Sequence, residues 1–238
     1  MRLKYEAKNA WEFERENNKL EDVMNYSKGY MHFLDVGKTE RTSAREIVRM
    51  AKENGYISID EAMNNGKVNP GDKIYAVNKD KAVALFIMGK NKLENGMKII
   101  GGHIDSPRID LKPHPLYQEA NLGFFKTHYY GGIKKYQWTT IPLSIHGVIA
   151  KTNGEKIEVN IGESDEDPIF TITDLLPHLA QEQMQKKLKD GVEGENLNLL
   201  IGSIPYNDEK VSEKVKLNIL NISKCWNNFI YLDLAQQK

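Results

Sequence analysis

The order in which two hydrophobic patterns follow one another constrains the fold of this chain most strongly. Apolar side chains recur at helical spacing through about the first 65 residues, and residues 39–56 form the clearest amphipathic helix, which Gly55 ends. Three apolar runs of strand length come next, and the third is GMKIIGGHID at residues 96–105. Helices followed by buried apolar strands predict a layered α/β domain.

The sequence pattern changes near residue 108, where short β-rich segments alternate with turns that contain Pro, Gly and Asn. The clearest hairpin spans residues 145–162, with Asn153-Gly154 as its turn. A helical element is predicted from about Thr173 or Asp174 to Gly191, and another helix near the end of the chain. We therefore predict an α/β portion over 1–107, a β-rich domain over 108–205, and a helix returning to the first domain over 206–238.

Charge and cysteine content exclude several classes of protein. The chain has 33 basic and 33 acidic residues, so no net field attracts it to nucleic acid or to a membrane surface. The first residues lack the apolar core of a signal peptide, and no run is long enough to span a bilayer. A single cysteine, Cys225, excludes an internal disulfide and a cysteine-rich zinc site. We expect a cytoplasmic protein.

His103 and Asp105 are the candidate site residues, because they end the third apolar run. On an extended strand, residues i and i+2 point to the same side, about 6–7 Å apart, so both side chains could face one pocket. A neutral imidazole is a good zinc ligand, and a carboxylate can fix its tautomer by accepting the other ring proton. The His-x-Asp spacing alone also suits a surface histidine or one bonded to a neighbour, and that alternative stays open.

The segment GGHIDSPRIDLKP resembles the signature of the aspartyl aminopeptidase family of dizinc metallopeptidases. Further segments resemble the same family in the same order, and the likeness covers about residues 15–222. These segments are RTSAREIVRMAKENGY, THYYGGIKKYQWTTIPLSIHGVI, ITDLLPHLA and NLLIGSIP.

The resemblance implies that His103 binds zinc and that Asp105 is a catalytic residue supporting this ligand. It implies a zinc-peptidase α/β domain interrupted by a barrel-like dimerisation domain, two zinc ions with a bridging water, removal of N-terminal residues from peptides, and a homo-oligomer. No nucleic-acid or membrane partner is expected.

The likeness is incomplete in one respect. In the family, the remaining zinc ligands follow the β-rich domain, and their motifs are not found here. Residues from about 223 onward do not resemble the family, so we expect a truncated reading frame or half of a split gene, without peptidase activity of its own. A non-catalytic assembly protein is the main alternative. A dizinc phosphoesterase is less favoured, because the Asn-His motif it needs is missing.

The other histidines and the acidic cluster fit simpler interpretations. His114 and His128 are predicted to be exposed, and His146 is predicted to be a hydrogen-bonded histidine on the polar face of a strand. His178 matches a family histidine in the inserted domain, but a partner histidine found in some members is Glu182 here, which argues against a substrate role. Residues 163–168, ESDEDP, lack the glycine and distal glutamate of a calcium loop and read as an acidic turn.

Overall fold

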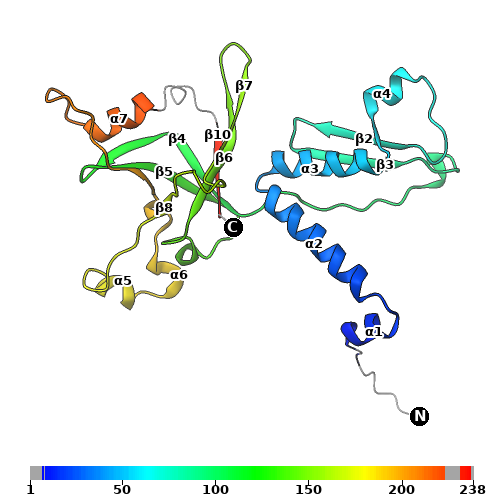
Figure 1. The fold of residues 1–238 in the computed structure, drawn as a ribbon, viewed down its shortest axis with the longest axis horizontal. Helices are drawn as coiled ribbons and strands as arrows, with labels where there is room; N and C mark the ends of the chain where they lie inside the picture. Colours follow the sequence, from blue (N-terminus) through cyan, green and yellow to red (C-terminus); the bar gives the residue numbers. More distant parts are fainter. Residues whose placement is uncertain (1–6, 8, 223–230, 237–238) are drawn as a thin grey trace. The chain divides into compact units, whose positions relative to one another are not determined.

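The structure is a computed structural model that describes residues 7, 9–222 and 231–236 (Figure 1). The chain divides into two compact units, Met1–Ile104 and Asp105–Lys238. Cys225 and most of the segment from residue 223 lie outside the described residues. The domain limits predicted from the sequence stay predictions.

The first unit begins with helices whose ends follow local capping signals. Thr39 caps the third helix, with its side chain accepting from the backbone N–H of Thr42, and Ser58 caps the fourth by accepting from that of Glu61. Gly55, with φ of +81°, follows the third helix as predicted. The helices are α1 (Ala10–Glu16), α2 (Leu20–Val36), α3 (Glu40–Glu53) and α4 (Ile59–Asn64).

A three-stranded sheet completes the first unit, in the order β1-β2-β3. Its strands are β1 (Ile57–Ser58), β2 (Lys73–Asn78) and β3 (Ala82–Ile87). β1 pairs in parallel with β2, and β2 pairs antiparallel with β3. α3 packs against β2 and β3, so the helix and the sheet form the two layers of this unit. The mixed α/β class is therefore confirmed for the described residues.

Two predictions for the strands of this unit were wrong. Residues 96–107 form no strand; they follow the short 3-10 turn η1 (Leu93–Asn95) as irregular chain, and Ile100 is fully exposed. β3 forms in the second of the three predicted apolar runs, but it is not buried, with Ile87 65% exposed. A strand needs a neighbour for its backbone hydrogen bonds. Among the described residues, no strand forms a β-ladder with residues 96–107, so local strand propensity alone does not make this segment a strand.

The second unit is built on a seven-stranded sheet in the order β7-β6-β10-β4-β5-β9-β8. All its pairings are antiparallel. The strands are β4 (Arg108–Glu119), β5 (Leu122–Tyr130), β6 (Leu143–Ala150), β7 (Lys156–Ile161), β8 (Thr171–Ile172), β9 (Leu199–Gly202) and β10 (Tyr231–Gln236). β6 and β7 form the predicted hairpin around Asn153-Gly154.

This sheet is not a closed barrel in the described part of the chain. β7 and β8 lie at its two ends, and one isolated bridge, Leu143 to Phe170, connects the start of β6 with the residue before β8. β4 loses its register with β5 between Leu111 and Leu116, where the sequence is KPHP. Proline cannot donate a ladder hydrogen bond, which explains the irregularity.

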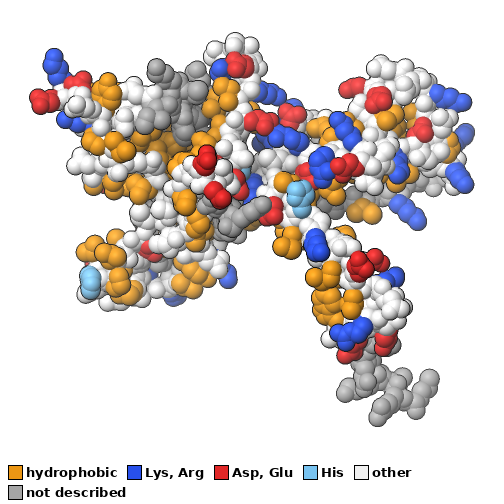
Figure 2. All heavy atoms as spheres, in the orientation of Figure 1, with side chains coloured by type: hydrophobic (Ala, Val, Ile, Leu, Met, Phe, Trp, Pro, Cys, Tyr) orange, Lys and Arg blue, Asp and Glu red, His pale blue; other side chains and the backbone are white. Residues whose placement is uncertain are grey.

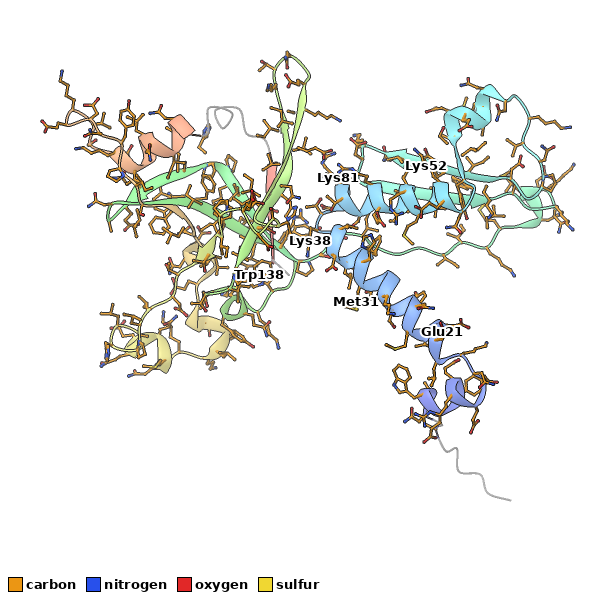
Figure 3. The ribbon with its side chains drawn as sticks, viewed as in Figure 1. Glu21, Met31, Lys38, Lys52, Lys81 and Trp138 are labelled. Carbon is orange, nitrogen blue, oxygen red and sulfur yellow. The ribbon has the colours of Figure 1, made fainter. Side chains whose placement is uncertain are left out.

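The hydrophobic core of the second unit is one continuous cluster. Its side chains come from most strands of the sheet and from the loops between them. One of these loop residues, Trp138, directly follows the turn η2 (Lys135–Gln137) and is labelled in Figure 3. Its buried members are Ile109, Phe125, Trp138, Leu143, Ile145, Phe170, Ile172, Val192, Leu197 and Leu199. Burial of this much apolar surface is the main source of the unit's stability.

The helices of the second unit are shorter than predicted. Residues 173–180 are not helical; α5 (Gln181–Gln185) and α6 (Leu188–Gly191) follow, and the second ends at Gly191 as predicted. Pro177 explains the late start, because it disfavours helical backbone at the residue before it. The turn η3 (Gly194–Asn196) precedes β9, and α7 (Lys214–Ile222) packs against β4 and β5.

No helix in the described part of the chain is both long enough and apolar enough to cross a membrane.

Candidate metal site

His103 lies in the irregular segment that joins the two units. Its side chain is exposed, and Gly101 and Gly102 before it have no heavy atom within 4 Å of where a Cβ would be. The division between the units falls after Ile104, so His103 belongs to the first unit and Asp105 to the second. The predicted strand that would have set both side chains on one face is not formed, so the same-face geometry loses its basis. The roles of both residues stay predictions.

Asp105 is half-buried and is held by the second unit. The Tyr130 hydroxyl, at the end of β5, donates a hydrogen bond of 3.0 Å to Oδ2 of Asp105. A carboxylate anchored in this way keeps a fixed orientation relative to its sheet. Tyr130 was not among the residues selected from the sequence.

The Arg108 side chain packs against the face of the Tyr130 ring. Its guanidinium carbon lies 4.2 Å from the centre of the Tyr130 ring, and its Nε donates a 2.7 Å hydrogen bond to Oδ1 of Asp110. The Arg108 side chain is only 12% exposed, so this ion pair is shielded from water more than most surface pairs. Asp105, Tyr130, Arg108 and Asp110 therefore form one connected polar group, which we call the Tyr130 cluster.

The described residues do not assemble a complete zinc centre. His103 offers an exposed imidazole, which is a suitable zinc donor. Among the described residues, no group of three or more His, Cys, Asp or Glu side chains is placed to hold a metal ion. A zinc site requires three or four protein ligands, and the part of the chain that the structure describes does not bring that number together.

Two histidines match the simpler interpretations, and His146 matches its prediction only in part. His114 and His128 are exposed, and the His128 ring stacks on Tyr129. His146 is hydrogen-bonded as predicted, but it is buried: its Nε2 lies 2.9 Å from Ser144 Oγ and 3.1 Å from Glu163 Oε1. Nothing in the sequence marked Glu163, within the acidic stretch, as the partner of a buried histidine.

The rest of the acidic stretch is an ordinary turn. Asp167 accepts the backbone N–H groups of Gly162 at 2.9 Å and Ser164 at 3.1 Å. These two hydrogen bonds lower the pKa of the Asp167 carboxyl. Oδ2 of Asp167 therefore accepts two backbone donors, which agrees with the prediction of a turn.

His178 lines a cleft of about 640 Å³ in the second unit. Thr139, Asp174 and Glu182 line it as well, and Asp174 Oδ1 accepts a 3.0 Å hydrogen bond from the Gln183 amide. His178 itself is exposed, and Leu175 and Leu179 give the cleft an apolar part beside these polar groups.

Comparisons with known proteins agree with this architecture. Residues 33–229 match the family described as aminopeptidase I zinc metalloprotease (M18). The match extends past residue 222, where the sequence analysis predicted that the likeness would end. A probable M18 family aminopeptidase 1 from Clostridium acetobutylicum is 47% identical over 218 residues, covering 91% of this chain and 47% of that protein.

Two solved structures show the same fold. The crystal structure of an M18 family aminopeptidase from Thermotoga maritima superposes with a TM-score of 0.87 at 41% identity, covering 98% of this chain and 51% of that one. The S. cerevesiae mApe1 dodecamer has a TM-score of 0.61 at 20% identity and covers 91% of this chain and 49% of that one. The chain spans about half the length of the curated relatives it matches. It belongs to the aminopeptidase I zinc metalloprotease (M18) family.

Proposed function

We propose that this chain supplies the first zinc ligand, His103, and its supporting carboxylate, Asp105, to an aminopeptidase that removes N-terminal residues from peptides. The observation that carries the proposal is the family match across residues 33–229, which includes both residues. The hydrogen bond from Tyr130 to Asp105 adds support, because it gives the carboxylate a fixed orientation.

The chemistry of these residues suits that role. A zinc ion, when bound, lowers the pKa of a coordinated water and so supplies a nucleophile near neutral pH. His103 would hold the ion through one ring nitrogen, and Asp105 would accept the proton of the other, which keeps the imidazole in the tautomer that binds metal. Two zinc ions and a homo-oligomer formed through the second unit are further parts of the proposal.

We propose further that the 238-residue chain does not hydrolyse peptides alone. His103 and Asp105 are the only site residues that the resemblance places in it, and two groups cannot hold two zinc ions tightly. A second polypeptide segment would have to supply the remaining ligands. A non-catalytic assembly role for the isolated chain is the alternative, and the continuous core of the second unit favours it, since that unit can hold its shape without a complete zinc centre.

An aminopeptidase assay tests the proposal. The purified chain is incubated with a set of chromogenic aminoacyl substrates, with zinc or manganese, alone and with the second half of a full-length relative produced separately. We expect turnover only in the mixture, and we expect His103→Ala to abolish it. Turnover by the chain alone would contradict its incompleteness. A mixture in which His103→Ala is as active as the wild type would contradict the role of His103.

A further inference from the structure

β3 is the strand at one end of the three-stranded sheet of the first unit (Figure 1). Among the described residues it forms a ladder with β2 alone, so its other edge is not paired with a strand. We infer that this edge binds a strand of a second polypeptide, the part of the M18 fold that the longer relatives carry and this chain does not match. The inference deepens the proposed function, because that proposal requires a second polypeptide segment and this surface gives it a place to bind.

The sequence of β3, AVALFI, carries none of the features that protect an exposed edge strand. Its six residues are all apolar, without a charge or a proline, and its register with β2 is continuous, without a bulge. Natural edge strands usually have at least one of these features, since an unprotected edge pairs with other chains. β3 therefore has the sequence of a strand that is paired on both sides.

β7 in the second unit shows a protected edge in the same chain. It also lies at the end of its sheet, but its exposed side chains, Lys156, Glu158 and Asn160, alternate with partly buried apolar ones. This alternation is typical of a strand with one face on the core and one in solvent. β3 has no such alternation, so the two sheet ends differ in kind.

The faces of β3 are open as well as its edge. Successive side chains of a strand point to opposite faces, so Leu85 and Ile87 lie on one face and Phe86 on the other. Leu85 and Phe86 are each 46% exposed, and Ile87 is 65% exposed. A strand that is apolar on both faces is typical of a sheet interior covered from both sides. The partner therefore has to bring covering structure together with its strand.

This requirement favours the missing part of the M18 fold over a second copy of the chain. Two copies paired through their β3 edges would extend the sheet sideways without adding a layer over the open faces. The relatives, in contrast, have about as much further chain again: the match covers 91% of this chain but only 47% of the Clostridium acetobutylicum protein. A polypeptide of that size can supply a strand for the edge and a layer for the faces.

The pairing with β2 identifies the backbone groups that point to the free edge. The N–H of Met88, directly after β3, donates to the Asp72 carbonyl at 2.9 Å and so faces β2. Backbone groups alternate in direction along a strand, so the amides of the even-numbered residues of β3 face β2 as well. The amides of the odd-numbered residues, Val83, Leu85 and Ile87, face outward, and we call them the outward amides.

The experiment removes one outward amide from the full chain. Leu85→Pro deletes an N–H that the ladder with β2 does not use and places a proline ring in the path of an added strand. Leu85→Ala is the matched control, because it loses the same side chain and keeps the N–H. Each form is co-produced with the tagged second half of the Clostridium acetobutylicum relative. Dilution of the purified complex measures affinity, and residue-resolved hydrogen exchange measures protection of each amide.

We expect the outward amides to exchange at least tenfold more slowly in the complex than in the isolated chain. Leu85→Pro should weaken binding about tenfold more than Leu85→Ala, since it removes a backbone hydrogen bond at the new edge. Wild-type protection of the Phe86 amide in Leu85→Pro shows that the ladder with β2 is intact. If this protection is lost, the outward amides of the wild-type complex decide the question without the variant.

Three results would overturn the inference. The first is that no complex forms, and the second is a complex in which the outward amides exchange as they do in the isolated chain. The third is self-association of the isolated chain that protects the same amides, which would assign the edge to a second copy. A complex with protected outward amides but no turnover contradicts the proposed function alone, whereas turnover without this protection contradicts the inference alone.

Discussion

At the scale of single residues, Glu46 in α3 couples the stability of the first unit to pH. Only 8% of this residue is exposed, and both carboxylate oxygens accept from Arg49, at 2.8 Å and 2.6 Å. These hydrogen bonds lower the pKa of Glu46 below its ordinary value of 4.5. Because the folded-state pKa is the lower one, the stabilisation is complete above the unfolded pKa and is lost as pH falls through the folded pKa.

We therefore expect the free energy of unfolding of the first unit to fall as the pH is lowered below about 4.5, and Glu46→Gln to flatten this dependence. Hydrogen exchange of α3 amides across this pH range measures it. Glu61→Gln, at an exposed position in α4, is the control and should keep the wild-type slope. An identical slope in Glu46→Gln and wild type would contradict the assignment.

Ser144 is a second residue whose removal has a defined cost. It is fully buried, donates to Glu163 at 2.9 Å, and lies 2.9 Å from His146. Ser144→Ala removes a partner from the buried His146 and from the partly buried Glu163, so we expect a loss of about 1–3 kcal/mol in the stability of the second unit. Urea unfolding measures this loss. Ser164→Ala, in the exposed neighbouring turn, should change stability by less than about 0.5 kcal/mol.

At the scale of elements, the end of β7 depends on a glycine. Gly162 has φ of +108°, and a Cβ there would lie 2.9 Å from the Ser144 Cα and 3.3 Å from the Leu143 carbonyl oxygen. Both contacts are with backbone on β6, which cannot move aside without disturbing the hairpin. Gly162→Ala should therefore destabilise the second unit by about 2–4 kcal/mol, from backbone strain and overpacking together.

Gly154 provides the matched control in the same hairpin. Its φ is +85°, but a Cβ there would meet no heavy atom within 4 Å. Gly154→Ala should cost only about 1–2 kcal/mol, the penalty of the left-handed conformation. Equal costs for the two substitutions in chemical denaturation would show that close packing at Gly162 contributes nothing.

Elements defined by neighbours in sequence were the ones predicted well. The helix end at Gly55 and the Asn153-Gly154 turn act within a few residues, so periodicity and turn chemistry locate them. The strand predicted at residues 96–105 is not formed, because a strand requires a pairing partner that the local sequence does not specify. The site shows the same limit: His103 and Asp105 stand out in the sequence, whereas Tyr130 reaches Asp105 only through the pairing of β4 with β5.

At the scale of the whole molecule, the two units differ in how much apolar surface they bury. Among the described residues, the buried apolar residues of the first unit are Ala44, Ala51, Ala62 and Ile74, whereas the core cluster of the second unit alone has ten buried members. α2 has no buried residue among its 17, and hydrophobic side chains are visible on the surface of the first unit (Figure 2). Met31 on this helix, labelled in Figure 3, is 63% exposed.

We therefore expect the amides of β2 and β3 to exchange with solvent at least tenfold faster than those of β5 and β6, because less free energy opposes local opening in the first unit. Hydrogen–deuterium exchange with mass spectrometry measures this difference. Adding the second half of a full-length relative should slow exchange in β3 and leave β6 unchanged. Equal protection of both units in the isolated chain would contradict the expectation.

The exposed apolar side chains of β3 and of the segment around Ile100 also have a consequence for the turnover of this polypeptide in a cell. Extended apolar segments open to water are what chaperones and proteases recognise on newly made chains. When the chain is synthesised without the second half of a full-length relative, we therefore expect a short half-life and extensive binding by chaperones. Co-production with such a companion should raise its abundance even before any enzymatic turnover is measured.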